Sequence, residues 1–264
     1  MIEQPVSVES LCNDFGNLGI GQGSRVLVHS SFRSVGPVER GPDGLVDALL
    51  TAIGPSGMLV VPTFTYRSER FDPRTTPGRT GAVSEAVRLR SDTHRSLHPF
   101  YSVAAIGPEA SVLCVGHELQ PGTGIDTPLD RHAAHGGLIV LIGVGHEANT
   151  TIHVGEFHAA VSYLDIPFDP TWPTTAEVVA PTGNMMCSYD RFPGCSRAFS
   201  VLEAPLRARG AVRDGTVGAA AAQVVPARAV IDEAVALLAD NETALLCSDP
   251  DCFRCPRARA RIAC

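Results

Sequence analysis

A strand, a helix and a second strand in direct succession constrain the fold of this chain more than any other feature. Residues 25–28 are an apolar run that predicts a buried strand, and the apolar positions over 44–53 recur at helical spacing. A glycine and a proline at positions 54 and 55 end the predicted helix, and residues 58–61 form a second apolar run. The order strand, helix, strand is a βαβ unit, so the sequence predicts an α/β fold.

Later segments extend this pattern along the chain. We predict a helix over 81–90, strands over 101–106 and 138–144, a hairpin over 175–187 with its turn at 181–184, and a helix over 226–240. The proline-rich stretches 69–80 and 166–174 are expected to be long loops of the kind that often cover a functional site. The sequence therefore predicts a single α/β domain over 1–246, with a central mixed sheet flanked by helices. Residues 247–264 are expected to form an irregular, cysteine-containing tail packed on that domain.

Composition excludes several classes of protein. The chain has 264 residues and a formal net charge of -7, which argues against a nucleic-acid-binding protein because such proteins need a basic surface. All 21 basic residues are arginines, so a phosphate-binding lysine and a Schiff-base lysine are excluded. The apolar runs fall short of the roughly 18 residues that a membrane span needs. We therefore expect no membrane association and a cytoplasmic location.

A histidine and a glutamate three residues apart are the main candidates for catalysis. His153 and Glu156 lie in the segment Asn-Thr-Thr-Ile-His-Val-Gly-Glu, residues 149–156, after an apolar run. On a helix this spacing puts both side chains on one face, where the carboxylate can fix the imidazole tautomer and stabilise the imidazolium. The pair therefore predicts a general base. A structural histidine that has found a buried partner is the alternative.

Four motifs give the chain a resemblance to a known family. They are Val-His-Ser-Ser-Phe-Arg-Ser-Val-Gly at 28–36, Gly-Met-Leu-Val-Val-Pro-Thr-Phe-Thr at 57–65, Arg-Ser-Leu-His-Pro-Phe-Tyr-Ser-Val at 95–103 followed by Thr127-Pro128-Leu129, and Gly143-Val144-Gly145-His146 running into 149–156. In the order and spacing of these motifs, nearly the whole chain resembles the aminoglycoside 3-N-acetyltransferases. These are antibiotic acetyltransferases whose fold is unrelated to that of the GNAT acetyltransferases.

The resemblance implies transfer of an acetyl group from acetyl-CoA to an amine, often the 3-amine of a 2-deoxystreptamine ring. It makes His153 the base that takes the amine proton and Glu156 the residue that orients it. The small hydroxyl residues of the first strand-to-helix turn are then expected to hold the CoA pyrophosphate, and an ordinary N-capping turn is the alternative. The expected CoA-binding residues are Ser30, Ser31, Ser34, Val35 and Gly36, with Ser96, His98 and Pro99 along the CoA channel.

The acceptor side of the site is expected to come from other segments. Its components would be Tyr66, the loops 69–80 and 166–174, and Asp190. Carboxylates in that region would favour a polyamine sugar, whereas arginines such as Arg67 and Arg74 would favour an anionic amine. Donors for the oxyanion of the tetrahedral intermediate are expected from the turns at 29–31 or 62–63.

The remaining histidines are expected to have no part in catalysis. His29 ends a buried strand, where a structural role is favoured over a catalytic one. Four others lie in polar segments and are expected to be solvated: His94, His117, His132 and His135.

The tail carries three closely spaced cysteines. Cys252-x-x-Cys255 has the spacing of a zinc knuckle, and Cys247 offers a third thiolate. The fourth ligand is open, and the candidates are Cys264, Cys187 and Cys195. A structural zinc would attach the tail to the domain. Reduced thiols without a metal are the alternative.

The sequence as a whole favours an acetyl-CoA-dependent N-acetyltransferase whose partners are CoA and an amine-bearing small molecule, as a monomer or a homodimer. One alternative keeps the acyl transfer but uses a non-aminoglycoside amine of secondary metabolism. A second alternative is a non-catalytic CoA-binding protein that has kept the scaffold. The presence of both His153 and Glu156 argues against this second alternative.

Overall fold

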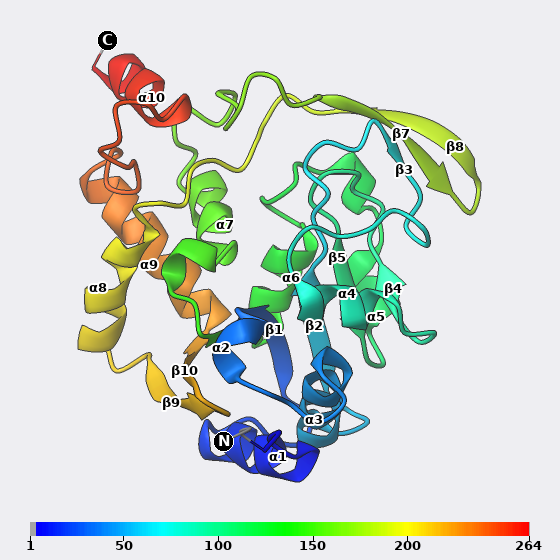
Figure 1. Cartoon of the computed structure of the whole chain (residues 1–264). Coiled ribbons are helices and arrows are strands. Elements are labelled where there is room, and N and C mark those ends of the chain that lie inside the picture. Colours follow the sequence, from blue (N-terminus) through cyan, green and yellow to red (C-terminus); the bar gives the residue numbers. More distant parts are fainter. Residues whose placement is uncertain (1–3, 264) are drawn as a thin grey trace.

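A seven-stranded mixed sheet forms the centre of the molecule (Figure 1). The computed structural model describes residues 4–263. In sheet order, the strands are β4 (His94–Arg95), β5 (Val103–Ile106), β2 (Met58–Pro62), β1 (Arg25–Ser30), β6 (Leu138–Ile142), β10 (Ala220–Pro226) and β9 (Arg213–Val217). β1 pairs in parallel with β2 and with β6, and the outer strands pair antiparallel. The predicted mixed sheet is confirmed.

Helices cover both faces of this sheet. α1 (Val8–Asn17), α3 (Pro42–Ile53) and α4 (Ala82–Arg88) pack on one face. α5 (Ala110–Cys114), α6 (Pro128–Ala134), α7 (Thr151–His158) and α9 (Ala227–Asp240) pack on the other. The strands are apolar on both sides because successive side chains alternate between the two cores. In β1, Val26 and Val28 enter the first core and Leu27 the second.

Shorter elements surround the main sheet. A second sheet has the order β3 (Arg70–Phe71), β7 (Thr175–Ala180) and β8 (Gly183–Ser188). It projects from one side of the molecule in Figure 1. The other short elements are α2 (Phe32–Val35), η1 (His117–Leu119), η2 (His146–Ala148), η3 (Phe199–Leu202), α8 (Glu203–Ala208) and α10 (Arg254–Ile262). Among the described residues, no helix combines the length and the apolar character needed to cross a membrane.

The elements predicted from apolar runs are confirmed, with shifts of a few residues at their ends. The βαβ unit is β1–α3–β2, and the hairpin is β7–β8, which turns at residues 181–182. The tail differs from its expected irregular form because α10 spans nine of its residues. Cys255, Ala258 and Ile262 recur at helical spacing in α10, but this stripe is short and is interrupted by arginines.

Helix α7 lies directly against α9 in the core. A Cβ on Gly155 would lie 2.5 Å from the Cβ of Ala234 and 3.3 Å from the carbonyl oxygen of Ile231. Glycine therefore permits the close approach of the two helices, and this approach sets the position of His153 on α7.

We expect Gly155→Ala to destabilise the fold by about 1–3 kcal/mol, because the added methyl group overpacks the α7–α9 contact. The measurement is the free energy of unfolding in chemical denaturant. Adding Ala234→Gly should recover part of the loss. Gly16→Ala is the control, since α1 has open space at that position and the change should stabilise by about 0.4–1 kcal/mol. Equal effects at both glycines would contradict the close-packing argument.

Two histidines expected in solvent are buried. The Nε2 of His117 donates to the carbonyl of Gly122 at 3.2 Å, and its Nδ1 accepts from the hydroxyl of Ser96 at 2.9 Å. The Nε2 of His132 donates to the carbonyl of Leu138 at 3.2 Å. Burial lowers the pKa of His117 to about 3 and that of His132 to about 4. Both rings are therefore neutral, and the expectation of solvation is wrong for them.

These histidines should make folding stability fall as the pH is lowered. Between the ordinary pKa of 6.5 and the folded values near 3 and 4, the unfolded chain binds more protons than the folded one. The contribution is present above pH 6.5 and is lost toward pH 4. In His132→Gln, which keeps a donor for Leu138, we expect a shallower fall in the thermal midpoint between pH 7 and pH 5. The exposed His94→Gln should keep the slope of the parent protein; identical slopes in all three would contradict this account.

Candidate functional site

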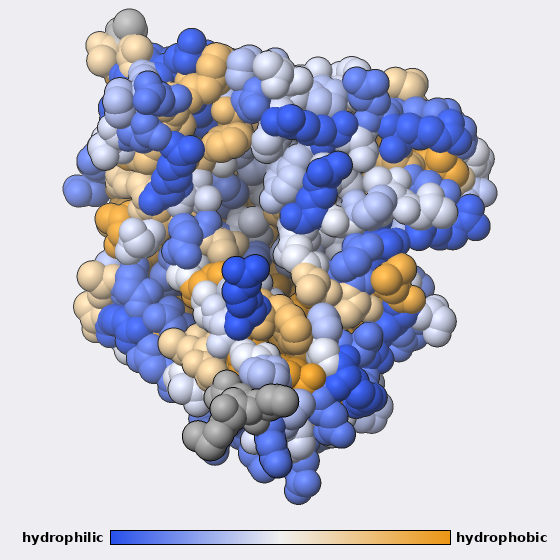
Figure 2. Space-filling view, in the orientation of Figure 1, coloured by the Kyte–Doolittle hydropathy of each residue, from blue (hydrophilic) through white to orange (hydrophobic). Residues whose placement is uncertain are grey.

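A deep pocket opens where the three parallel strands end. Its volume is about 490 Å³, and its wall includes residues from the carboxyl ends of β1 and β2 and from the segment after β6. Ligands of open α/β sheets bind at this edge. Figure 2 shows the corresponding face hollowed near its middle. The lining residues are His29, Ser30, Pro62, Phe64, Tyr66, Thr80, Ser84, Tyr101, Thr123, Val144, Glu147, Ala148, Thr150, His153, Phe168, Trp172, Pro193, Gly194, Ser196 and Arg197.

Of the predicted His–Glu pair, His153 lines this pocket and Glu156 lies next to His153. Both residues are on α7, where the His153 side chain is 5% exposed and that of Glu156 is 2% exposed. The Nδ1 of His153 lies 2.6 Å from Oε2 of Glu156. Because a carboxylate only accepts, this contact assigns the Nδ1 proton to the histidine and leaves Nε2 as the basic nitrogen. The ring also meets Phe199 edge to face, with centroids 4.7 Å apart.

A second contact to the same nitrogen comes from the loop before η3. The backbone nitrogen of Gly194 lies 3.4 Å from Nδ1 of His153. Nδ1 cannot donate to Glu156 and accept from Gly194 at once, and the 2.6 Å contact to the carboxylate is the stronger of the two. We therefore treat Gly194 as a packing neighbour that limits rotation of the imidazole.

The start of α7 is built by the Asn-Thr-Thr sequence. The side-chain oxygen of Asn149 accepts from the backbone N–H of Thr151 at 3.2 Å, and its amide meets Nδ1 of His146 at 3.1 Å. Asparagine is favoured at such a position because its side chain replaces a missing backbone partner at the helix start. These contacts set the register of α7 that brings His153 to the pocket.

His29 also lines the pocket, although a structural role was favoured for it. It is 5% exposed, and its Nε2 has no hydrogen-bond partner among the described residues. Burial lowers its pKa to about 3, with His132 and His146 acting in the same direction, so the ring is neutral. Its place at the carboxyl end of a central parallel strand is the sequence signal that could have identified it as a pocket residue.

The first motif contributes its strand end to the wall of the pocket and then forms the single turn of α2. Ser30 lines the pocket, and the hydroxyl of Ser34 donates to that of Ser31 at 2.9 Å. The Val35 side chain is buried in the core, so only its backbone is available to a ligand. Gly36 has φ 85°, a backbone conformation that glycine adopts readily. CoA binding by this segment stays a prediction.

Of the third motif, Tyr101 lines the pocket, whereas the three residues expected along the CoA channel lie away from its wall. Ser96, His98 and Pro99 are buried and are not among its lining residues. The Nδ1 of His98 accepts from the backbone N–H groups of Phe100 and Tyr101, which makes it part of an internal turn. Their contact with CoA stays a prediction.

The N–H groups of Ser31 and Thr63 are already paired. They donate to the carbonyls of Ile142 and Ser102, each at 2.8 Å. Two hydroxyls that the sequence analysis missed lie in the pocket wall instead. The Oγ1 atoms of Thr123 and Thr150 are buried there without a hydrogen-bond partner among the described residues. These hydroxyls are the better candidates to stabilise an oxyanion.

Aromatic residues form the far side of the pocket. Tyr66, predicted for the acceptor side, packs against Trp172, with ring centroids 5.3 Å apart. The ring of Phe168 packs on Trp172 as well, with centroids 5.5 Å apart. Tyr66 has φ 61°, a strained conformation of the kind found at functional sites. Thr80, Phe168 and Trp172 bring the two predicted loops to the pocket, whereas Asp190 lines a separate surface depression.

The arginines of this region are turned to other partners. Arg67 pairs with Asp169 at 3.4 Å, and Arg74 pairs with Asp72 at 3.6 Å. Neither lines the pocket. Arg197 does line it and forms an ion pair with Asp249. The two arginines expected to favour an anionic amine are therefore absent from the pocket wall, and the arginine that lies there is already paired with a carboxylate.

Comparison with known proteins supports the resemblance seen in the motifs. The family model described as Aminoglycoside 3-N-acetyltransferase matches residues 27–239. Aminoglycoside N(3)-acetyltransferase IV of Salmonella sp is 36% identical over 225 residues, which cover 84% of this chain and 83% of that protein.

Solved structures have the same architecture. A histidine-to-alanine variant of aminoglycoside acetyltransferase AAC(3)-IVa in complex with a gentamicin superposes with a TM-score of 0.86 at 32% identity, covering 98% of this chain and 99% of that one. AAC-IIIb in a binary complex with CoASH gives a TM-score of 0.80 at 25% identity, covering 90% of this chain and 97% of that one. With the family model matched over most of its length, the chain belongs to the aminoglycoside 3-N-acetyltransferase family of acyltransferases.

Proposed function

We propose that this protein transfers the acetyl group of acetyl-CoA to the 3-amine of an aminoglycoside. The proposal is based on the buried pair of His153 and Glu156, which are 2.6 Å apart, with His153 in the wall of the pocket. Family membership and the ligands of the similar structures, a gentamicin and CoASH, support the choice of substrates.

In the proposed reaction, Nε2 of His153 takes the proton that the amine loses as its nitrogen bonds to the thioester carbon. The tetrahedral intermediate then collapses, the carbon–sulfur bond breaks, and the CoA thiolate leaves and is protonated. Glu156 holds the Nδ1 proton and stabilises the imidazolium formed in the first step. Hydroxyl groups of Thr123 or Thr150 are placed to donate to the oxyanion. The reaction needs no covalent acyl-enzyme.

The donor is expected on the side of the pocket formed by residues 30–36. Arg33 is exposed in α2, and the described residues give its guanidinium no hydrogen bond or ion pair. A free guanidinium beside the Ser31 and Ser34 hydroxyls suits a pyrophosphate, which takes both charge and hydrogen bonds. This set would bind the nucleotide end of CoA.

The acceptor is expected against Tyr66, Phe168 and Trp172. Flat aromatic faces suit sugar rings and attract cationic amines. Glu147 is the carboxylate in the pocket wall, and its exposed position leaves it open to an ammonium group. The net charge of -7 also favours a polycationic substrate over an anionic one.

The test is thiol release from acetyl-CoA with 2-deoxystreptamine aminoglycosides, an amino-nucleoside and simple amines as acceptors. We expect release with an aminoglycoside and a loss of about 10²–10⁴-fold in kcat for His153→Ala, because the general base is removed. CoA binding, followed by calorimetry, should be unchanged in this variant.

His158→Ala is the matched control, since His158 lies on the same helix and pairs with Asp130 outside the pocket. Release that is independent of His153 would contradict the assignment of the base. Release with only the other amines would instead favour the secondary-metabolism alternative. CoA binding without turnover on any acceptor would favour the non-catalytic one.

Replacing the orienting carboxylate gives a separate prediction. Glu156→Gln keeps an acceptor for the Nδ1 proton but removes the charge that stabilises the imidazolium. A hydrogen bond to a charged group contributes about 1.5–3 kcal/mol, so kcat should fall about ten- to hundredfold with little change in the KM values. An unchanged kcat would show that Glu156 has only a packing role.

Three further expectations belong with this proposal. A cytoplasmic location fits unpaired cysteines, which persist in a reducing compartment, and it fits acetyl-CoA as the donor. A monomer and a homodimer both stay open. The zinc ion considered for residues 247–264 would have no part in the transfer itself.

A further inference from the structure

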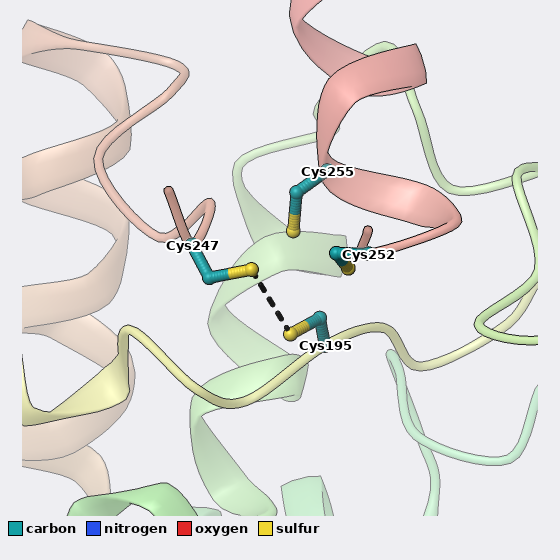
Figure 3. Close-up of side chains that lie close together, drawn as sticks. All are labelled: Cys195, Cys247, Cys252 and Cys255. Atoms are coloured by element: carbon teal, nitrogen blue, oxygen red, sulfur yellow. Dashed lines mark hydrogen bonds between the residues drawn. The ribbon is translucent and has the colours of Figure 1, made fainter. Parts of the chain in front are cut away.

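A cluster of four buried cysteines lies outside the catalytic machinery. Cys195 comes from the loop before η3, Cys247 from the loop after α9, Cys252 from just before α10 and Cys255 from its first turn (Figure 3). Their sulfur atoms all lie within 4.8 Å of one another. Figure 3 shows the side chains converging from these three separate segments.

The distances fit one tetrahedral metal ion. Zinc–sulfur bonds of about 2.3 Å in a tetrahedron separate neighbouring sulfurs by about 3.8 Å. The sulfurs of Cys195 and Cys247 lie 3.7 Å apart. A disulfide needs a separation of about 2.05 Å, so this contact is not a disulfide bond.

Two of the sulfurs lie beside backbone N–H groups of the ligand loops. The backbone N–H of Arg197 donates to the sulfur of Cys195, and that of Asp249 to the sulfur of Cys247. Such second-layer hydrogen bonds orient thiolate ligands and offset part of their charge. Arg197 and Asp249 also form an ion pair with each other, which joins the two ligand loops.

We propose that Cys195, Cys247, Cys252 and Cys255 bind one structural zinc ion, and that this zinc holds the wall 193–197 of the acceptor pocket in place. Cys195 supplies the fourth ligand that the spacing of the tail cysteines leaves open. Cys187 lies in β8, away from the cluster, and Cys264 is outside the described residues.

The link from the metal site to the pocket runs through the chain neighbours of Cys195. Pro193, Gly194, Ser196 and Arg197 all line the pocket, so fixing the sulfur of Cys195 fixes this wall from behind. Gly194 is also the residue whose nitrogen lies 3.4 Å from Nδ1 of His153.

A second link from the metal site to the pocket is made by Arg254, which lies between Cys252 and Cys255 in the sequence. Arg254 is fully buried, and its guanidinium donates to the carbonyl of Ile166 and lies 5.4 Å from the ring of Tyr163. A Cβ on Gly194 would lie 2.3 Å from Nε of Arg254, so the side chain packs directly on the Gly194 backbone. Zinc bound by Cys252 and Cys255 would hold Arg254 in this position.

Metal content of the purified full-length chain is the first test. We expect one zinc ion per chain by elemental analysis, released by an organomercurial that blocks thiols. Cobalt added to the apo chain should give the visible absorption of a tetrahedral thiolate complex. Cys195→Ser should weaken zinc retention at least tenfold, as measured by competition with a chelating dye.

Cys114→Ser is the matched control, because Cys114 is equally buried but lies on α5, where its thiol faces the carbonyl of His94. It should keep zinc at the level of the parent protein. Iron in place of zinc, two disulfides on mass analysis, or four freely alkylated thiols in a folded metal-free chain would each overturn the site. These readouts use the parent chain and do not depend on the folding of a variant.

The role in the pocket is tested by kinetics and rests on the proposed acetyl transfer. Zinc removal should raise the KM for the aminoglycoside at least fivefold and leave the KM for acetyl-CoA within twofold, because Arg254 joins the wall 193–197 to Ile166, the first residue of the predicted acceptor loop 166–174. Restoring zinc should reverse the change. Equal KM values in the zinc-bound and zinc-free forms would overturn the supporting role while leaving the metal site intact. Failure of the transferase proposal would appear separately, as a zinc-containing chain with no turnover.

Discussion

Parallel pairing of β1 with both β2 and β6 is the constraint on which the site depends. It places three strand carboxyl ends side by side, and each end delivers residues to one pocket: His29 and Ser30, Pro62, and the segment that leads into α7. The outer strands pair antiparallel and add no further carboxyl ends next to these three. The fold thus restricts the chemistry to one edge of the sheet.

Burial without charge is common among the histidines of this fold. His29, His117 and His132 are all held neutral by the loss of solvent around their rings. His153 differs because a carboxylate within hydrogen-bond distance can stabilise its charged form. His153 is thus equipped to accept a proton, whereas His117 and His132 serve as neutral hydrogen-bonding groups.

Sequence reasoning succeeded where the signal is local. The apolar runs of β1, β2 and β6 and the stripes of α3 and α9 indicated the mixed sheet and its helices, and the spacing of His153 and Glu156 indicated their shared helix face. It failed at β9, where four of five residues are exposed and no alternation marks a strand. It also failed at His117 and His132, whose polar neighbours in sequence concealed burial by distant segments. Cys195 could not be separated from Cys187 as a candidate ligand, since it lies 52 residues from Cys247 and local spacing carries no such information.

The register of β1 has a consequence for how the enzyme is made. Val26 pairs with Leu59 on one side and with Leu138 on the other, so the pocket exists only after a long segment of chain has been closed into a loop. Contacts between residues so distant in sequence are entropically costly to form and slow the folding of a domain. A fragment that contains only the first βαβ unit would hold His29 and Ser30 but neither His153 nor Glu156. Binding competence is therefore a late and cooperative property of this chain, gained in the same step that completes its central sheet.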